Sequence, residues 1–243
     1  MTSANSGRRG LTWAITGGLV LVAGIVAIII GSLLTQRTPT PTDPTGEPTT
    51  QPTPQTTPGD DEVVDPSVAD RGWRPEPITT DAATYIRAAL EAASSFDTTK
   101  GEREAWLDYL DTWFTPDTRF NSEADQQAAM TDSQGLMRQG VVLPQQDWDS
   151  LANEDGRVVA ATTGDIAFVP VSDDASGDMS IGTADVTLSF TRSDGDGSET
   201  SYDEQVRVSV QVLCGAGSVP TPDSAQQSGD CKVVRYFTEP LEP

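Results

Sequence analysis

The residue types that most often carry out protein chemistry are scarce in this chain. It contains no histidine among its 243 residues, which excludes Ser-His-Asp and Cys-His catalysis and zinc sites ligated by histidine. Lys100 and Lys232 are its only lysines, and no Ser-x-x-Lys, Gly-x-Ser-x-Gly or Gly-x-Gly-x-x-Gly motif occurs. Carboxylates are so abundant that the presence of carboxylate pairs does not indicate any particular catalytic mechanism. We therefore expect no catalytic residue, no cofactor and no metal. The side chains left for an acid–tyrosine site are Tyr85, Tyr109, Tyr202 and Tyr236.

One acidic loop has a spacing that could bind a cation. Residues 193–198 read Ser-Asp-Gly-Asp-Gly-Ser, and Asp-x-Asp-Gly is a fragment of an EF-hand calcium loop. The complete loop needs a glutamate at its twelfth position and a helix on each side, whereas Glu199 follows too early and both flanks alternate as strands do. Asp-Gly repeats are ordinary in hairpin turns, so we favour a hairpin over a calcium site.

The two cysteines have a spacing that favours a disulfide. Cys214 ends one alternating, valine-rich segment and Cys231 begins the next, so a hairpin closed by residues 215–230 would bring them face to face. The alternative is two unpaired buried thiols. The even number of cysteines and an oxidising compartment favour pairing, which should stabilise the domain by ~3 kcal/mol in the chain-entropy model.

The charge distribution divides the chain into three regions, residues 1–37, 38–77 and 78–243. The net charge is −22, from 15 basic and 37 acidic residues, which argues against nucleic-acid binding. Basic residues predominate in the N-terminal tail, residues 1–10. Residues 11–34 are uncharged, the stretch from Leu19 to Ile30 is apolar on every side, and as a helix residues 11–34 would span ~36 Å, enough to cross a ~30 Å hydrocarbon core. A cleaved signal peptide is the alternative, but its apolar stretch is only ~7–15 residues long.

These features predict a single-pass protein of the plasma membrane, held in the lipid bilayer by residues 11–34. Arg8 and Arg9 keep the short tail in the cytoplasm, so the C-terminal domain lies outside. Residues 35–77 are rich in proline and threonine and then in acids, which predicts a disordered, extended stalk rather than a PxxP docking segment. Trp73 is expected to pack on the edge of the domain.

Residues 78–243 predict an extracytoplasmic domain of the α+β class, with N-terminal helices packed on one face of a curved antiparallel sheet. Helical spacing runs from Asp81 to Phe96 with Thr80 as N-cap, and Thr99 with Glu102 has the spacing of a capping box for a second helix. Two further helices are expected from Ser122 to Met137 and from Pro144 to Leu151. Alternation of apolar and polar residues then predicts strands over 157–162, 165–171, 184–192, 205–214 and 231–238.

The aromatic face of the second predicted helix has two interpretations. Trp106 and Trp113 lie on it together with leucines at helical spacing. They could line a ligand pocket or, if exposed, contact a partner. Such faces are more often core, and we favour that interpretation.

The whole arrangement resembles the bitopic assembly proteins of conjugation, or type IV secretion-like, machines of Gram-positive, actinobacterial-type bacteria. Their outer domains resemble the cone-shaped fold of nuclear transport factor two, and the stretch Tyr85–Phe120 is similar to the paired N-terminal helices of those cones. The resemblance covers residues 78–243 in element order and includes no diagnostic motif, so it transfers no catalytic residue. It implies an envelope subunit whose partners are other envelope proteins or further copies of itself.

Two functions of different kinds follow from this resemblance. In the first, the chain is a non-enzymatic scaffold or assembly subunit of a cell-envelope complex. In the second, the cone is a membrane-tethered pocket that binds a small molecule or isomerises it. A cone filled by side chains favours the first, and an open cavity with an inward carboxylate beside a tyrosine favours the second.

Overall fold

The structure is a computed structural model that describes residues 62–241. The predicted cytoplasmic tail, the predicted membrane helix at 11–34 and the stalk up to residue 61 lie outside the described residues. Within residues 62–241, no helix has both the length and the apolar character needed to span a bilayer. The described elements are the short 3-10 helix η2 (Pro66–Arg71), α1 (Ala82–Ala92), β1 (Phe96–Asp97), α2 (Arg103–Asp111), α3 (Glu123–Gly140), α4 (Gln145–Ala152), β2 (Arg157–Val169), β3 (Met179–Ser193), β4 (Glu199–Leu213) and β5 (Lys232–Phe237).

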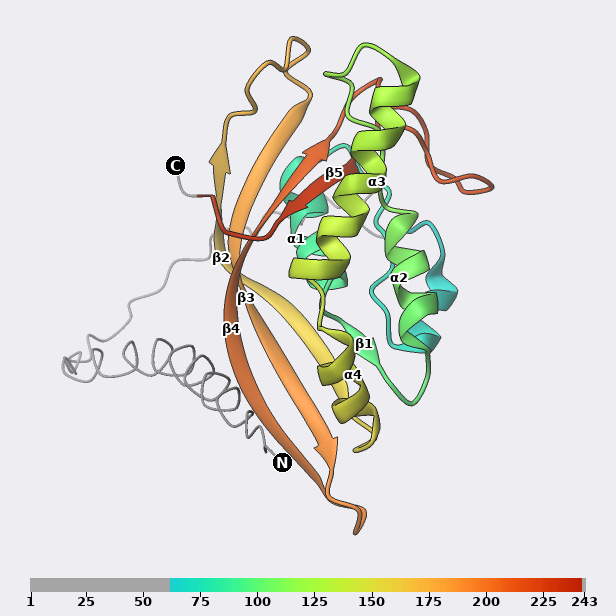
Figure 1. Ribbon diagram of the computed structural model, residues 1–243, viewed down its shortest axis with the longest axis vertical. Helices are drawn as coiled ribbons and strands as arrows, with labels where there is room; N and C mark the ends of the chain where they lie inside the picture. The colour runs from blue at the N-terminus through green and yellow to red at the C-terminus, as the bar shows by residue number, and fades with distance from the viewer. Residues whose placement is uncertain (1–61, 242–243) are drawn as a thin grey trace, which may run out of the picture. The chain divides into compact units, whose positions relative to one another are not determined.

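The strands form one antiparallel sheet in the order β1-β2-β3-β4-β5, and the helices all lie on one of its faces (Figure 1). This confirms the predicted α+β class, and the long strands follow the helices as a meander, while the two-residue β1 lies between α1 and α2. The three long strands bend around the helices, and the β3–β4 hairpin continues beyond α4 (Figure 1). Alternation places Val186, Val210 and Val212 on the inner face, where they are buried against the helices.

A close approach between α1 and the sheet depends on one glycine. A Cβ at Gly182 would lie 2.7 Å from Cδ1 of Ile86 and 2.8 Å from Cγ2 of Ile166. Real Cβ atoms do not come so close to a neighbour. The absence of a side chain in β3 therefore allows Ile86 of α1 to pack directly on the strand.

The folded part begins earlier than the boundary predicted at residue 78. Within residues 62–77, Val68 and Trp73 are 5% and 4% exposed, and the indole of Trp73 stacks on Tyr109 with ring centroids 5.4 Å apart. The amide of Val64 donates to the carbonyl of Glu76, which closes this segment on itself. The acidic composition suggested disorder, but the few apolar residues are enough to dock the segment on α2.

Two predicted helix starts are also corrected. Asp81, not Thr80, is the N-cap of α1, and its carboxylate accepts a hydrogen bond of 2.7 Å from the amide of Thr84. The capping box does not form, because Thr99 donates instead to Asp97 and α2 begins after Glu102, which makes no side-chain cap. The two strands predicted around residues 163 and 164 are one continuous strand, β2, with a register shift between Thr163 and Ala167.

The edge of β2 beyond β1 is closed by side chains of α1 and the residues that follow it. Ser95 accepts from the amide of Ala160 at 3.1 Å, and Glu91 accepts from the amide of Thr162 at 3.1 Å. Arg87 donates to the carbonyl of Gly164 at 2.8 Å. Four residues of helix rise ~6 Å and two residues of strand rise ~6.6 Å, so side chains four apart on the helical segment meet main-chain groups two apart on the strand. This pairing removes the edge as a template for other strands.

Candidate functional site

The base of the β4–β5 hairpin is joined by the predicted disulfide. Cys214 follows β4 and Cys231 precedes β5, and the two residues are bonded with their Cα atoms 4.0 Å apart. The register pairs Leu213 with Lys232 next to the bridge. The disulfide therefore closes the connection 215–230 onto the same end of the sheet as Lys232.

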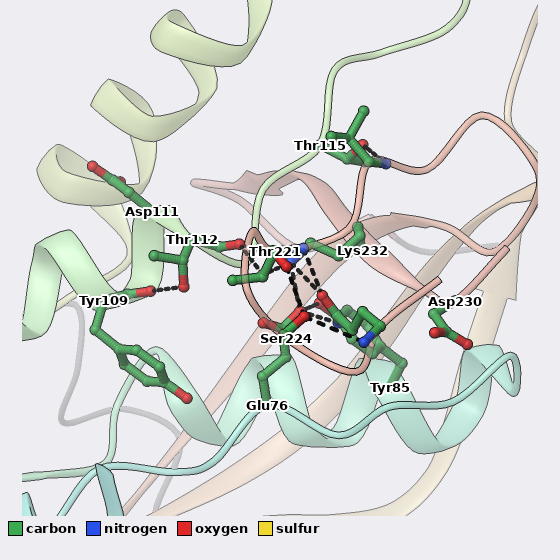
Figure 2. Close-up of polar contacts among 12 residues, drawn as sticks. Glu76, Tyr85, Tyr109, Asp111, Thr112, Thr115, Thr221, Ser224, Asp230 and Lys232 are labelled. Atoms are coloured by element: carbon green, nitrogen blue, oxygen red, sulfur yellow. Dashed lines mark hydrogen bonds and ion pairs between the residues drawn. The ribbon is translucent and has the colours of Figure 1, made fainter. Parts of the chain in front are cut away.

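Lys232 forms a buried ion pair with Glu76 at this end of the sheet (Figure 2). Its Nζ lies 2.8 Å from Oε1 of Glu76, and the two side chains are 1% and 0% exposed. The same ammonium donates to the carbonyl of Thr112 at 2.7 Å and to Oγ1 of Thr221 at 2.8 Å. One lysine thus connects β5 with the N-terminal segment, the end of α2 and the disulfide-closed connection.

Glu76 collects two further donors on the same carboxylate oxygen. The hydroxyl of Tyr85 donates to Oε1 at 2.6 Å, and Nε2 of Gln226 donates to it at 3.1 Å. Burial raises the pKa of Tyr85 well above its ordinary value, and the negative charge of Glu76 raises it further, so the hydroxyl stays protonated and donates. Burial lowers the pKa of Lys232, while Glu76 acts in the opposite direction.

This arrangement has the residue types of an acid–tyrosine site but not its chemistry. Oε2 of Glu76 has no hydrogen-bond partner among the described residues, but a general base also needs a substrate within reach, and Glu76 is fully buried with its charge neutralised by Lys232. Burial raises the pKa of Tyr85, so its hydroxyl stays protonated, and that hydroxyl is buried and bonded to Glu76 rather than directed at an open space. The cluster is therefore a structural connection between segments that are distant in the sequence.

The remaining tyrosines are spread over the domain. Tyr236 is buried and donates to the carbonyl of Ala89 at 2.8 Å, and burial raises its pKa. Tyr109 donates to the carbonyl of Arg74 at 2.7 Å. Tyr202 is 39% exposed on the part of β4 that extends beyond the helices. No two of these four rings share a single open pocket with a carboxylate in the described part of the chain.

Trp106 and Trp113 are core residues. They are 0% and 1% exposed. Trp106 packs against Phe96 and Trp148 with ring centroids 5.0 and 5.5 Å away, and Trp113 packs against Tyr85 at 5.8 Å. The aromatic face of α2 is therefore used inside the domain and is not a contact surface.

The acidic loop at residues 193–198 is the turn of the β3–β4 hairpin. The hydroxyl of Ser198 donates to Asp194 and Asp196, at 3.1 and 2.6 Å, and Gly195 and Gly197 adopt positive φ. Across residues 62–241, no three or more acidic or cysteine side chains are arranged to hold a metal ion.

Two adjoining concavities lie on the inner face of the sheet where the helix layer ends. The larger, of about 310 Å³, is lined by Leu188 of β3, Glu204 and Val206 of β4 and the connection between α3 and α4. The second, of about 240 Å³, is lined by Tyr202, Glu204 and α4. Both are distant from the Glu76 cluster and share no lining residue with it.

Sequence reasoning did not identify Glu76 or the two concavities. Glu76 lies in the segment interpreted as stalk, so nothing suggested that it is buried. Lys232 did carry a signal, because it is one of two lysines and stands inside the apolar run Cys231–Phe237, where an ionisable side chain needs a partner. The identity of that partner is a long-range contact that spacing does not encode.

Comparison with known proteins gives little further information. No family model matches the chain, and no curated protein matches its sequence. Among solved structures, the chain is similar to the crystal structure of CagV, a VirB8 homolog of T4SS from Helicobacter pylori strain 26695. The sequences are 16% identical, the match covers 55% of this chain and 78% of that chain, and the TM-score is 0.28. A likeness of this extent does not identify the function of this chain.

Proposed function

We propose that this chain is a membrane-anchored, extracytoplasmic, non-enzymatic subunit that takes part in assembling a cell-envelope complex. The observation that carries the proposal is the filled interior between helices and sheet. Tyr85, Phe96, Trp106 and Trp113 occupy it and are at most 2% exposed, and Glu76 is sealed by Lys232. Such an interior supports a rigid body and offers no place for a substrate.

The surface chemistry supports a role in protein contact. The net charge of −22 keeps the protein soluble and favours contacts that are polar and sensitive to salt. The part of the predicted stalk that precedes the folded segment, residues 35–61, would hold the domain at a distance from the membrane, which helps it to meet fixed partners more than a diffusing substrate. A conjugation or type IV secretion-like machine is the class of complex that we propose, on the element order described above.

The alternative function, a ligand-binding or isomerase-like cone, has one feature in its favour. Tyr202 and Glu204 both line the concavity of about 240 Å³. Both side chains are exposed, however, so water is not excluded from this concavity. We therefore place the alternative second.

Deletion of the folded domain tests the proposal. A chain that keeps residues 1–61 but lacks residues 62–241 should still enter the membrane. Mild cross-linking followed by purification should then recover no larger complex, while the intact chain brings its partners with it. A matched variant, Tyr85→Phe, should keep the complex because it removes only one internal hydrogen bond.

Two results would overturn the proposal. One is a complex that assembles equally well without the domain. The other is a Tyr202→Phe variant that loses the biological activity while the complex still forms, because that outcome would assign the function to a hydroxyl in an open concavity.

A further inference from the structure

The first half of β4 forms an open sheet edge. β5 pairs only with Ser209–Leu213, so the preceding residues have β3 on one side and, among residues 62–241, no strand on the other. After Phe237 the chain leaves the sheet, and Leu241 crosses the outer face, where its amide donates to Oγ of Ser209 at 2.8 Å. Every residue of Glu199–Val206 is exposed. Figure 1 shows this half of the hairpin projecting past the helices.

The direction of the main-chain groups along this edge follows from β5. The amide and carbonyl of Val233 bond to Trp113 and Thr115, on the side away from β4. Val212, which is paired with Val233, therefore turns its own groups toward β3. The β3–β4 register continues without a shift, so the alternation carries along the strand. The amide and carbonyl groups that face the open edge belong to Ser201, Asp203 and Gln205.

This edge is not protected in the way that the other edges are. Side chains of the α1 region cap β2, and residues 113–115 cover β5. Among the described residues, no loop or helix makes a recorded main-chain hydrogen bond to Ser201, Asp203 or Gln205 from the open side. An unpaired edge of this length is a template for one more strand.

The larger concavity lies beside the edge and would receive side chains of such a strand. On the inner face, Leu188 and Val206 line the concavity of about 310 Å³, and Glu204 lies at its margin. On the outer face, the carboxylate of Asp203 is exposed and, in the described part of the chain, accepts a hydrogen bond of 2.7 Å from Ser189. An added strand would place alternate side chains in an apolar groove and beside a carboxylate.

Charge decides the kind of partner. The chain has a net charge of −22, and most arginines and lysines of the described part are already paired with its own acids. A second copy would bring the acids of both edges together, and like charges opposite each other are unfavourable. We propose that the β4 edge binds an extended, positively charged segment of another envelope protein, which adds to the sheet beside Ser201–Gln205. This inference rests on the proposed assembly function and names the kind of partner.

Titration of a synthetic peptide into the full chain in detergent micelles tests the inference. The probe is a decapeptide of alternating lysine and valine with a fluorescent label, and binding is followed by polarisation. Gln205→Pro removes the outward amide without touching the bonds to β3, and Gln205→Ala is the matched control that keeps it. Ser201→Pro is a second edge variant, and circular dichroism establishes that each variant is folded.

We expect the peptide to bind the native chain and Gln205→Ala with affinities within about twofold of each other. Gln205→Pro and Ser201→Pro should each weaken binding by about tenfold, the effect of losing one main-chain hydrogen bond at the edge. Raised salt should weaken binding, and a glutamate–valine peptide of the same length should not bind.

Three outcomes would overturn the inference. The first is equal binding to the proline and alanine variants, which would reduce the contact to adhesion between opposite charges. The second is equal binding of the acidic peptide. The third is a dimer of the native chain that the proline variants dissociate, which would make a second copy the occupant. None of these outcomes depends on recovery of the membrane complex, so they are distinguishable from failure of the proposed function.

Discussion

Replacing Lys232 by methionine would remove the charge at the centre of the buried cluster while keeping the length of the side chain. Glu76 would then be buried without a cation, and the carbonyl of Thr112 and the hydroxyl of Thr221 would lose a donor. Breaking a buried ion pair by removing one partner costs ~3–5 kcal/mol. A domain of this kind has a free energy of unfolding of ~5–15 kcal/mol, so the variant should lose a large fraction of its stability.

A double variant separates the ion pair from the loss of packing. Glu76→Gln also removes the negative charge but leaves an oxygen that accepts from Tyr85, so Glu76→Gln with Lys232→Met contains no uncompensated ion. The double variant should therefore be more stable than the sum of the single changes predicts, by ~1–3 kcal/mol. A coupling near zero would mean that the two charges do not stabilise each other.

Urea unfolding of the full chain, followed by tryptophan fluorescence, measures these differences because Trp73 and Trp113 are buried near the cluster. Lys100→Met is the matched control. Lys100 is 53% exposed and lies 3.4 Å from Asp97, and an exposed pair contributes only ~0–1 kcal/mol. If Lys232→Met destabilised the protein no more than Lys100→Met does, our view of the cluster as the main connection between segments would be wrong.

Further outcomes follow from other contacts. Asp81→Ala should lower the free energy of unfolding by ~1 kcal/mol relative to Asp81→Asn, because only asparagine keeps an oxygen for the first turn of α1. Reducing the disulfide should lower the urea midpoint by the equivalent of ~3 kcal/mol. Replacing both Arg87 and Glu91 by alanine should uncover the β2 edge and produce oligomers in sedimentation velocity. Replacing Arg8 or Arg9 of the N-terminal tail alone should not produce oligomers. Burial alone would raise the pKa of Asp117, but hydrogen bonds from Arg119 hold it below its ordinary value. Its contribution to stability should be complete above about pH 4 and lost as the pH falls through the lowered pKa, so Asp117→Asn should flatten the dependence of the urea midpoint on pH in that range.

The alternation of valines in the second half of the chain made most of the sheet predictable. The valines at alternate positions from Val206 to Val212 are separated by polar residues. This alternation alone predicts that the valine side chains of the strand face the core, independently of how the helices are arranged. The same pattern located the cysteines at the base of one hairpin, and the structure bonds them there. These features are local, so that spacing along the chain determines them.

The errors concern features that depend on distant partners. Helical spacing predicts that the first helix reaches Phe96, but α1 ends at Ala92, because Phe96 and Asp97 instead pair with β2 as the two-residue strand β1. Residues 62–77 have the composition of a linker, yet Glu76 is fully buried because Lys232 and Tyr85 meet it from other elements. Thr99 had the spacing of a cap, but Asp97 competed successfully for its hydroxyl. In each case a contact that composition and spacing do not encode decided the outcome.

The contrast between the closed interior and the open edge bears directly on function. A buried carboxylate that needs both a lysine and a tyrosine to satisfy it is costly to place, and it is retained here at the point where four segments meet. A chain that seals its interior in this way, and caps the edge of β2 with three side chains, has the means to cover the β4 edge as well. Within residues 62–241, that strand instead continues past the helices with no other main chain bonded to its outward amides and with acids beside them. An exposed edge invites aggregation unless charge protects it, and the carboxylates of this strand repel other copies while they attract a cationic strand. If the chain is the assembly subunit that we propose, the same acids would serve both solubility and partner selection.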